Sequence, residues 1–330
     1  MESRKGAEKM RDSFNREIDY VRLSVTDRCD LRCTYCMPEK GMCFLKKEEV
    51  LSQEEILFLL KALAEQDIKK VKITGGEPLV RRDTVALIAK IKEIKGIEKV
   101  TMTTNGIQLV RHAQALKDAG LDGLNISIDT LDPIEFRTIT RVGELTRVLD
   151  GLKAALKVGL PNIKINTVAR GELTDQEIVE IAGLAQNEDL HVRFIELMPI
   201  GLGKGCPGRT QEELFSVIQS AYGRLDPFEQ RLGNGPASYF SLPDFQGKIG
   251  FISALGHCFC AACDRIRITA DGNLKTCLHM DEGCSLKPAL TAQNKELLLT
   301  QIFSAIQQKP EKHHFLETQG DSRFMSQIGG

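Results

Sequence analysis

Six short β-type runs alternate with amphipathic stretches between residues 20 and 200. The runs lie at 20–25, 70–74, 99–105, 124–129, 162–168 and 191–198. Helical stretches separate them, including 52–67, where Ser52 and Glu55 have the spacing of a capping box, and 174–187, which begins at Thr174. Because repeated β-α-β units form parallel sheets, the pattern predicts an α/β fold, either an open doubly wound sheet or a closed or partial barrel.

Polar side chains recur at alternate positions in four of these runs. They are Lys70, Lys72 and Thr74; Thr101, Thr103 and Asn105; Asn125, Ser127 and Asp129; and Lys164 and Asn166. Alternate residues of a strand point to one side of the sheet. A single polar face is typical of an exposed edge strand, but recurrence in four runs favours a polar interior enclosed by the strands.

Composition excludes several classes of protein. The chain has 44 Lys and Arg against 45 Asp and Glu, so we expect no nucleic-acid partner and no attraction to an anionic membrane. It contains neither a signal-peptide pattern nor a run of about 18 apolar residues, which predicts a cytoplasmic protein. Ten cysteines in such a chain indicate metal or catalytic thiols rather than disulfides.

The rhythm changes after Pro199. Glycines at 201, 203, 205 and 208 indicate a loop, a helical stretch follows at 210–222, and the rest reads as irregular and contains several cysteines. We therefore divide the chain into an N-terminal extension at 1–17, a β/α domain at 18–205 and an irregular α+β segment at 206–330.

Three cysteines, Cys29, Cys33 and Cys36, follow the first run within residues 26–38. A loop that leaves a strand end is where α/β folds place chemistry. Three thiolates on a four-iron cluster leave one iron free to coordinate another molecule. A tetrahedral zinc site would need a further ligand such as histidine, and residues 26–47 contain no histidine. The spacing therefore predicts an open [4Fe-4S] cluster.

The Cys-x-x-x-Cys-x-x-Cys spacing, with an aromatic residue before the last cysteine, resembles the motif of the radical S-adenosylmethionine (SAM) superfamily. Other parts of the superfamily pattern follow in order, including Gly75-Gly76-Glu77-Pro78 after the second run. The resemblance implies a partial (β/α) TIM-like barrel of parallel strands with SAM at their carboxyl ends, where SAM is cleaved to a 5′-deoxyadenosyl radical. The SAM contacts that it implies are Tyr35, Gly76, Glu77, Ser127 and Met198.

A second group of cysteines lies in the C-terminal segment, at Cys258, Cys260, Cys263 and Cys277. Four such residues would suit either zinc or an electron-transfer cluster, and their spacing alone does not decide between the two. The surrounding Asp264-Arg265-Ile266-Arg267 and the later Asp271-Gly272-x-Leu274-Lys275-x-Cys277 resemble the GTP 3′,8-cyclases of molybdenum cofactor biosynthesis. That resemblance implies a second [4Fe-4S] cluster on Cys260, Cys263 and Cys277, with Cys258 as a non-ligand.

Basic residues accompany both cysteine groups. Arg265 and Arg267 are two apart, so in a strand they face the same way and would clamp a phosphate; the alternative is an exposed strand face. Cations within the runs would be costly to bury without a counter-anion, which favours a polyanionic ligand. The resemblance implies that this ligand is GTP, contacted by Arg22, Lys72, Thr103, Lys164, Arg193, Arg265, Ile266 and Arg267.

Two details qualify that GTP site. Lys72 stands where the family commonly has arginine, which keeps the charge but loses the bidentate fork. The sequence has no Gly-x-x-x-x-Gly-Lys-Ser/Thr loop. GTP would thus be rearranged rather than hydrolysed.

The resemblance also implies the reaction. The 5′-deoxyadenosyl radical would remove hydrogen from ribose C3′, and C3′ would then bond to guanine C8 to give (8S)-3′,8-cyclo-7,8-dihydroguanosine 5′-triphosphate. The catalytic residues would be Arg22, Arg265, Arg267 and the terminal Gly329 and Gly330, although a frayed terminus is the ordinary alternative. Its partners would be an external electron donor and a downstream cyclic pyranopterin monophosphate synthase, and a homodimer stays open.

Two other interpretations compete with this one. Another radical SAM enzyme with an auxiliary cluster, such as a peptide-maturing enzyme, would not need the Arg-x-Arg pair beside the second cysteine group. A non-catalytic iron–sulfur electron carrier or a zinc-binding module would need neither the Gly-Gly-Glu segment nor an open iron.

Overall fold

The computed structural model describes residues 9–281, 283–315, 321 and 323–329. Its strands form a single sheet in the order β12-β11-β10-β1-β2-β3-β4-β5-β6-β9-β8-β7. Neighbouring strands pair in parallel from β10 to β9 in this order. These eight strands are β1 (Tyr20–Ser24), β2 (Lys70–Thr74), β3 (Lys99–Thr104), β4 (Gly123–Ser127), β5 (Ile163–Ala169), β6 (Leu190–Glu196), β9 (Ile249–Ile252) and β10 (Arg265–Ile268). The order of the described strands has two ends, so the sheet is open, as a partial barrel requires.

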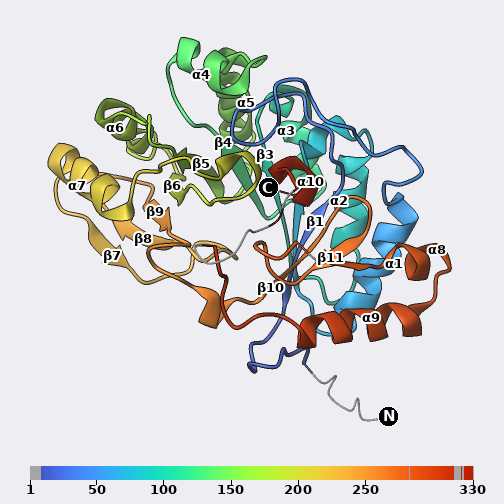
Figure 1. Ribbon diagram of the computed structural model, residues 1–330. Helices are drawn as coiled ribbons and strands as arrows, with labels where there is room; N and C mark the ends of the chain where they lie inside the picture. Colours follow the sequence, from blue (N-terminus) through green and yellow to red (C-terminus); the bar gives the residue numbers. More distant parts are fainter. Residues whose placement is uncertain (1–8, 282, 316–320, 322, 330) are drawn as a thin grey trace, which may run out of the picture.

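Antiparallel strands complete both edges of the sheet. They are β7 (Asp226–Phe228), β8 (Ser238–Ser241), β11 (Asn273–Lys275) and β12 (Cys284–Ser285). Helices lie around the outside of the curved sheet, and α10 lies inside the curve (Figure 1). The α-helices are α1 (Gln53–Ala64), α2 (Thr84–Lys92), α3 (Leu109–Asp118), α4 (Pro133–Thr140), α5 (Leu145–Lys157), α6 (Asp175–Gly183), α7 (Gln211–Tyr222), α8 (Lys287–Thr291), α9 (Lys295–Gln307) and α10 (Met325–Ile328). The described chain also contains the 3-10 turns η1 (Pro78–Val80), η2 (Gly201–Gly203) and η3 (Cys260–Ala262).

Local sequence signals account for most of these elements. All six predicted runs form strands β1 to β6, which confirms the parallel α/β prediction. Ser52 caps α1 and Thr174 caps α6, each by a capping box with the glutamate three residues later. Such reciprocal bonds satisfy backbone donors that the first helical turn leaves free. None of the described helices is long and apolar enough to cross a bilayer.

The two faces of each central strand differ sharply. In β1 the outward-facing Val21 and Leu23 are fully buried among aliphatic side chains of the surrounding helices, whereas Arg22 faces the interior of the curve. The same alternation holds in β5, where Ile163 and Ile165 pack outward and Lys164 points inward. The predicted polar interior is therefore present. Lys70 is an exception, because it does not line the pocket and its Nζ lies 2.7 Å from Asp19.

The C-terminal segment is more regular than the sequence predicts. Residues beyond 206 were expected to be irregular, yet β9 pairs with β6 and β10 pairs with β1, both in parallel. The segment thus extends the sheet at both ends. Sequence patterns miss this because β9 and β10 are only four residues long and obtain their partners from strands far away in the chain. The division at residue 205 stays a prediction.

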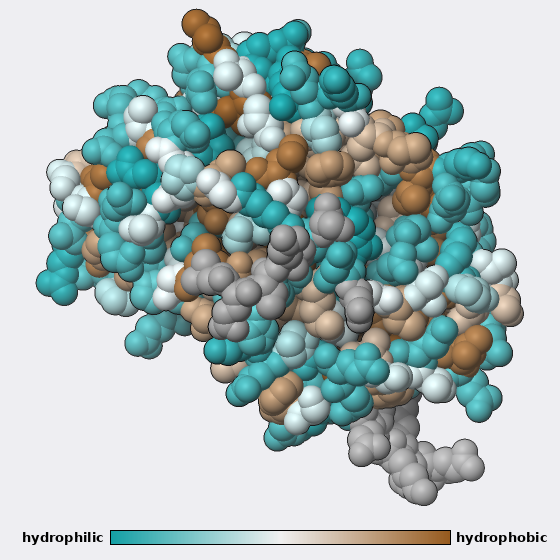
Figure 2. Space-filling model, in the orientation of Figure 1, coloured by the Kyte–Doolittle hydropathy of each residue, from teal (hydrophilic) through white to brown (hydrophobic). Residues whose placement is uncertain are grey.

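The face of the molecule that Figure 2 shows is mainly polar. On the face in Figure 2, hydrophobic residues lie singly or in small groups among hydrophilic ones. The large hydrophobic side chains that are most exposed, such as Ile134 and Val110, lie on separate helices, α4 and α3. The interior of the sheet, rather than this surface, is therefore the place to look for function.

Candidate functional site

A cavity of about 700 Å³ fills the interior of the curved sheet. All eight parallel strands contribute side chains to its wall, and both cysteine triplets open onto it. Its volume lies within the range of about 300–1,000 Å³ that is typical of small-molecule sites. One pocket therefore brings together nearly every residue that the sequence singles out.

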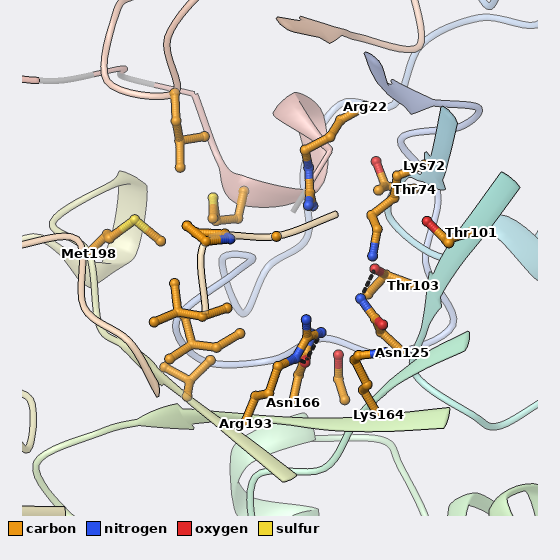
Figure 3. A pocket seen from close by; sticks show the side chains of 18 of the residues that line it. Arg22, Lys72, Thr74, Thr101, Thr103, Asn125, Lys164, Asn166, Arg193 and Met198 are labelled. Atoms are coloured by element: carbon orange, nitrogen blue, oxygen red, sulfur yellow. Dashed lines mark hydrogen bonds between the residues drawn. The ribbon is translucent and has the colours of Figure 1, made fainter. Parts of the chain in front are cut away.

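Strand register arranges the polar side chains of the pocket in rows. One row runs across β10, β1, β2 and β3 and contains Arg267, Arg22, Lys72 and Thr101. A second crosses β3, β4 and β5 with Thr103, Asn125 and Lys164, and a third crosses β4, β5 and β6 with Ser127, Asn166 and Arg193. Figure 3 shows the labelled members of these rows around one space, into which several strands project them: Arg22, Lys72, Thr101, Thr103, Asn125, Lys164, Asn166 and Arg193. Layers of side chains from neighbouring strands are how such barrels fill their interior.

The basic residues of the pocket face each other. Burial, together with the nearby charges of Arg193 and Arg22, lowers the pKa of Lys72 far below its ordinary value. Burial and Arg193 lower the pKa of Lys164 to about 7. Arg193 is 5% exposed and donates from Nε to Asn166 Oδ1 at 2.9 Å, a bond that fixes its orientation. A concentration of positive charge in a buried space is relieved by a polyanion, so the pocket fits a phosphate-rich ligand.

Arg265 and Arg267 line the pocket, and Ile266 between them faces the core. Arg267 is held by a bond from Nη1 to the carbonyl oxygen of Gly329 at 3.0 Å, and Arg265 lies over the rings of Tyr20 and Phe259. Ile266, which the sequence places among the substrate contacts, is fully buried in the hydrophobic core on the opposite side of β10. Its side chain therefore cannot touch a ligand in the pocket, because alternate residues of a strand face opposite ways.

Cys29, Cys33 and Cys36 line the pocket where the chain leaves the carboxyl end of β1. Burial raises the pKa of Cys29 to about 12 and that of Cys36 to about 11. Backbone N–H of Leu31 donates to the Cys29 sulfur at 3.3 Å. Bare thiolates are thus disfavoured here, whereas a cationic iron centre would offset the burial of charge. The donor set fits a three-cysteine cluster.

Gly75, Gly76 and Glu77 secure the same loop from the end of β2. A β-carbon on Gly76 would lie 2.4 Å from the carbonyl oxygen of Arg28, so only glycine fits there. Glu77 is 1% exposed, and its carboxylate accepts bonds from the backbone N–H groups of Leu79 and Asn105. Burial raises its pKa to about 7. Glu77 lines the pocket, but these bonds occupy both of its carboxylate oxygens with protein donors.

The other residues predicted to contact SAM lie around the same end of the pocket. Tyr35 donates to Asp129 at 2.5 Å, and burial raises its pKa well above the ordinary value. Ser127 ends β4, and Met198 follows β6 on the opposite side of the pocket from Thr101 and Thr103 (Figure 3). The structure therefore gathers Tyr35, Gly76, Glu77, Ser127 and Met198 in one pocket.

The second triplet lies at the opposite end of the strands. Cys263 lies two residues before Arg265, the first residue of β10, and Cys277 returns to that end because β11 runs antiparallel to β10. Although burial opposes it, the charges of Lys309 and Arg265 lower the pKa of Cys263. Arg265 lies opposite Tyr20 at the start of β1, and Ser24 lies four residues farther along β1. The levels of Arg265 and Ser24 along the strands therefore differ by about 13 Å. The three rows of polar side chains, here called the basic rows because each contains at least one lysine or arginine, lie between the two triplets.

Several functional candidates were missed by the sequence analysis. Residues 231–236 form a loop over the pocket, where a β-carbon on Gly233 would lie 3.5 Å from Lys164. Lys309 is 3% exposed and donates to the carbonyl oxygen of Arg265 at 3.0 Å. Arg16, within the predicted extension, donates to the carbonyl oxygen of Cys260 at 2.9 Å. Glycines such as those of this loop are common in turns, so they carry no specific signal, and nothing in the sequence links Lys309 or Arg16 to this site.

The C-terminal tail enters the pocket. Met325 and Ser326 line it, and Gly329 has a φ of +75° with Thr74 Oγ1 2.8 Å from where a β-carbon would be. Glycine is needed there for both reasons. Farther back, Asp321 and Lys275 form a fully buried ion pair that fixes the tail to β11. Gly330 lies outside the described residues.

Comparisons with known proteins give the family of this chain. A family model described as Radical SAM superfamily matches residues 23–185, and one described as Molybdenum Cofactor Synthesis C matches residues 190–315. The structure of Streptococcus suis SuiB is similar, with a TM-score of 0.62 over 94% of this chain and 77% of that chain. At 16% identity, this likeness shows the fold alone.

Curated relatives are much closer in sequence. The GTP 3′,8-cyclase of Heliobacterium modesticaldum is 46% identical over 327 residues, which cover 97% of this chain and 100% of the relative. The GTP 3′,8-cyclase of Moorella thermoacetica is 44% identical over 324 residues with the same coverage. The protein therefore belongs to the GTP 3′,8-cyclase family of the radical SAM superfamily.

Proposed function

We propose that this protein is a GTP 3′,8-cyclase that catalyses the first step of molybdenum cofactor biosynthesis. Its product is (8S)-3′,8-cyclo-7,8-dihydroguanosine 5′-triphosphate. The observation that carries this assignment is the single cavity in which buried cations lie between two cysteine triplets. A site for radical generation and a site for a polyanionic nucleotide thus share one space.

The carboxyl end of the strands would hold SAM and its cluster. Cys29, Cys33 and Cys36 are the ligands that the donor set supports for a [4Fe-4S] cluster. When bound there, the cluster and SAM would supply a 5′-deoxyadenosyl radical for removal of hydrogen from ribose C3′. Bonding of C3′ to C8 would leave one unpaired electron on the guanine, and uptake of one electron from the external donor and one proton would complete the 7,8-dihydro product. The chain's own part is to position SAM through Tyr35, Gly76, Glu77, Ser127 and Met198 and to exclude water from this end of the pocket.

The basic rows would hold the nucleotide. A charge pair about 4 Å apart contributes about 4 kcal/mol at an effective dielectric constant of 20, before desolvation. Several cations are thus needed to anchor a triphosphate, and the pocket offers Arg22, Lys72, Lys164, Arg193, Arg265 and Arg267, with Thr103 as a neutral donor. Arg193 is already oriented by Asn166, so little side-chain entropy is lost when a phosphate binds.

The amino end of the strands would hold a second [4Fe-4S] cluster on Cys260, Cys263 and Cys277. These three cysteines line the pocket beside Arg265, whereas Cys258 does not line it. In this proposal the guanine base lies toward the second triplet, and the ribose lies toward SAM. The spacing along the strands supports this arrangement, since the level of Arg265, near the second triplet, and the level of Ser24, toward the first triplet, are about 13 Å apart.

The tail would close the site. Arg267 donates to the carbonyl oxygen of Gly329, so the chain terminus and the arginine pair are positioned together. We infer that Arg22, Arg265, Arg267, Gly329 and Gly330 arrange the substrate for ring closure. An external donor would reduce the first cluster, and a cyclic pyranopterin monophosphate synthase would take up the product.

Release of 5′-deoxyadenosine tests this function. The anaerobically reconstituted and reduced protein is given SAM with GTP, with ATP or with neither nucleotide, and 5′-deoxyadenosine is measured by chromatography. We expect strong stimulation by GTP and little by ATP. SAM cleavage that is indifferent to GTP but stimulated by a peptide would replace this function with peptide maturation on the same superfamily fold.

A further inference from the structure

A second kind of metal site overlaps the C-terminal cysteine group. The ligand atoms of Cys258, Cys260 and His313 all lie within 4.8 Å of one another. Within the described part of the chain this is the one such group of three, and neither predicted cluster triplet is gathered as tightly. The proposed function uses Cys260 alone and leaves Cys258 and His313 without a role.

His313 has the arrangement of a metal ligand. Its Nε2 lies 2.7 Å from the carbonyl oxygen of Ala254, so Nε2 carries the proton and Nδ1 carries the lone pair. Nδ1 is buried and has no hydrogen-bond partner. A buried nitrogen left in this state is destabilising unless it gains a partner. Ligating histidines commonly donate their other N–H to a backbone carbonyl, which fixes the tautomer.

The two cysteines complete a soft donor set. Cys260 begins the turn η3, and Cys258 is exposed two residues earlier, so solvent reaches the group from that side. A tetrahedral ion with bonds of about 2.3 Å to sulfur and about 2.0 Å to nitrogen places its ligand atoms about 3.5–3.8 Å apart. Movement of roughly 1 Å would therefore close the site around an ion. Thiolates with imidazole favour Zn²⁺ or Fe²⁺ over Mg²⁺ or Ca²⁺.

We propose that Cys258, Cys260 and His313 bind a single Zn²⁺ or Fe²⁺ ion, with water from the exposed side as the fourth ligand. Binding releases two thiol protons and gives a centre with no net charge. Because Cys260 is also a ligand of the proposed second cluster, occupancy of one centre excludes the other; this part rests on the proposed function. The single-ion state keeps Cys260 in place when the cluster is absent.

Cobalt binding tests the site itself. The probe is Co²⁺ added to the full chain in which the remaining cluster cysteines, Cys29, Cys33, Cys36, Cys263 and Cys277, are replaced by alanine. We expect one Co²⁺ per chain, with thiolate charge-transfer bands and the intense visible bands of a tetrahedral ion. Adding Cys258→Ser or His313→Gln abolishes these bands, whereas the matched Cys284→Ser leaves them. Failure to bind Co²⁺, or an unchanged spectrum after Cys258→Ser, overturns the proposal.

Zinc competition in the otherwise unaltered chain is the second test, and it does not depend on the folding of the multiple variant. Apo protein receives one equivalent of Zn²⁺ before cluster reconstitution, and bound iron is then counted. We expect the bound iron of the wild type to fall by the content of one [4Fe-4S] cluster per chain, and we expect no such fall in Cys258→Ser. Equal iron in both proteins contradicts the exclusion. If the reconstituted wild-type protein does not convert GTP but the Co²⁺ test gives the expected spectra, the proposed function is wrong and this metal site is still supported.

Discussion

The two cysteine triplets lie at opposite ends of the same strands and are built in different ways. Cys29, Cys33 and Cys36 lie in one short loop after β1, at the carboxyl edge where α/β barrels normally place their chemistry. Cys260, Cys263 and Cys277 lie at the amino edge and depend on β10 and β11, which the C-terminal segment adds to the sheet. The first triplet is local in sequence, whereas the cysteines of the second triplet are positioned at the pocket only after β10 has paired with β1 and β11 has paired with β10.

Their surroundings differ in the same way. Burial raises the pKa of Cys29 and Cys36, whereas Lys309 and Arg265 lower that of Cys263. The first centre is thus enclosed within apolar and acidic groups, and the second adjoins the basic rows. This difference fits the proposed division of labour, with radical generation at one end and nucleotide anchoring at the other.

Removing one cysteine from each triplet should have the largest and most distinct effects. Cys33→Ala should abolish SAM cleavage, a loss of more than about a thousandfold, because the open cluster cannot form. Cys263→Ala should abolish GTP conversion but leave SAM cleavage without GTP at the wild-type level. Product and 5′-deoxyadenosine are measured together by chromatography. Equal loss of SAM cleavage in both variants would remove the division of labour.

The buried ion pair that fixes the tail should matter next. Asp321→Asn removes the carboxylate that pairs with Lys275 at a position where both side chains are fully buried, so the free energy of unfolding should fall by about 3 kcal/mol. Denaturant unfolding of the apo protein measures this. The control is Asp150→Asn, whose surface pair with Lys153 at 3.9 Å should contribute almost nothing. A loss for Asp321→Asn as small as that of the control would show that the pair does not fix the tail.

Arg193→Ala should weaken GTP binding about ten- to hundredfold, because a charge-assisted hydrogen bond contributes about 1.5–3 kcal/mol. Equilibrium binding to the anaerobic protein measures the dissociation constant. Arg224→Ala is the matched control, since that side chain is 82% exposed and pairs only with Asp226 at the surface in the described contacts. Unchanged affinity in Arg193→Ala would place the triphosphate away from the third row.

The affinity for GTP should also fall as pH rises. Lys164 has a pKa of about 7 in the free protein, and a bound triphosphate raises that pKa, so the complex holds more protons than the free protein. Binding is therefore strongest below pH 7 and should weaken by about tenfold toward pH 8.5. Lys164→Arg, which stays charged, should flatten the profile. An identical pH profile in the variant would show that Lys164 does not meet the phosphates.

How much the sequence could predict follows from how local each feature is. The six central strands, the helix caps at Ser52 and Thr174, and the inward polar rows follow from short-range periodicity and were confirmed. The pairing of β9 and β10 with distant strands could not be predicted, because four-residue strands carry little periodic signal. Ile266 stays a predicted substrate contact, although its side chain faces the core while those of Arg265 and Arg267 face the pocket.

Contacts made across the fold were missed for the same reason. Arg16 supports Cys260 from 244 residues away, and Lys309 supports Arg265 from 44 residues away. His313 is distant from Cys258 and Cys260 in the sequence and lies next to them only in the folded chain. No spacing rule links residues so far apart, whereas Cys29, Cys33 and Cys36 are read directly from one loop.

Transfer of deuterium from GTP tests the central claim most directly. GTP labelled with deuterium at ribose C3′ is given to the reconstituted protein with SAM, and the 5′-deoxyadenosine formed is analysed by mass spectrometry. If the first triplet generates the radical next to a nucleotide held between the two triplets, 5′-deoxyadenosine gains one deuterium from C3′. Unlabelled 5′-deoxyadenosine formed alongside converted GTP would contradict this arrangement of the pocket.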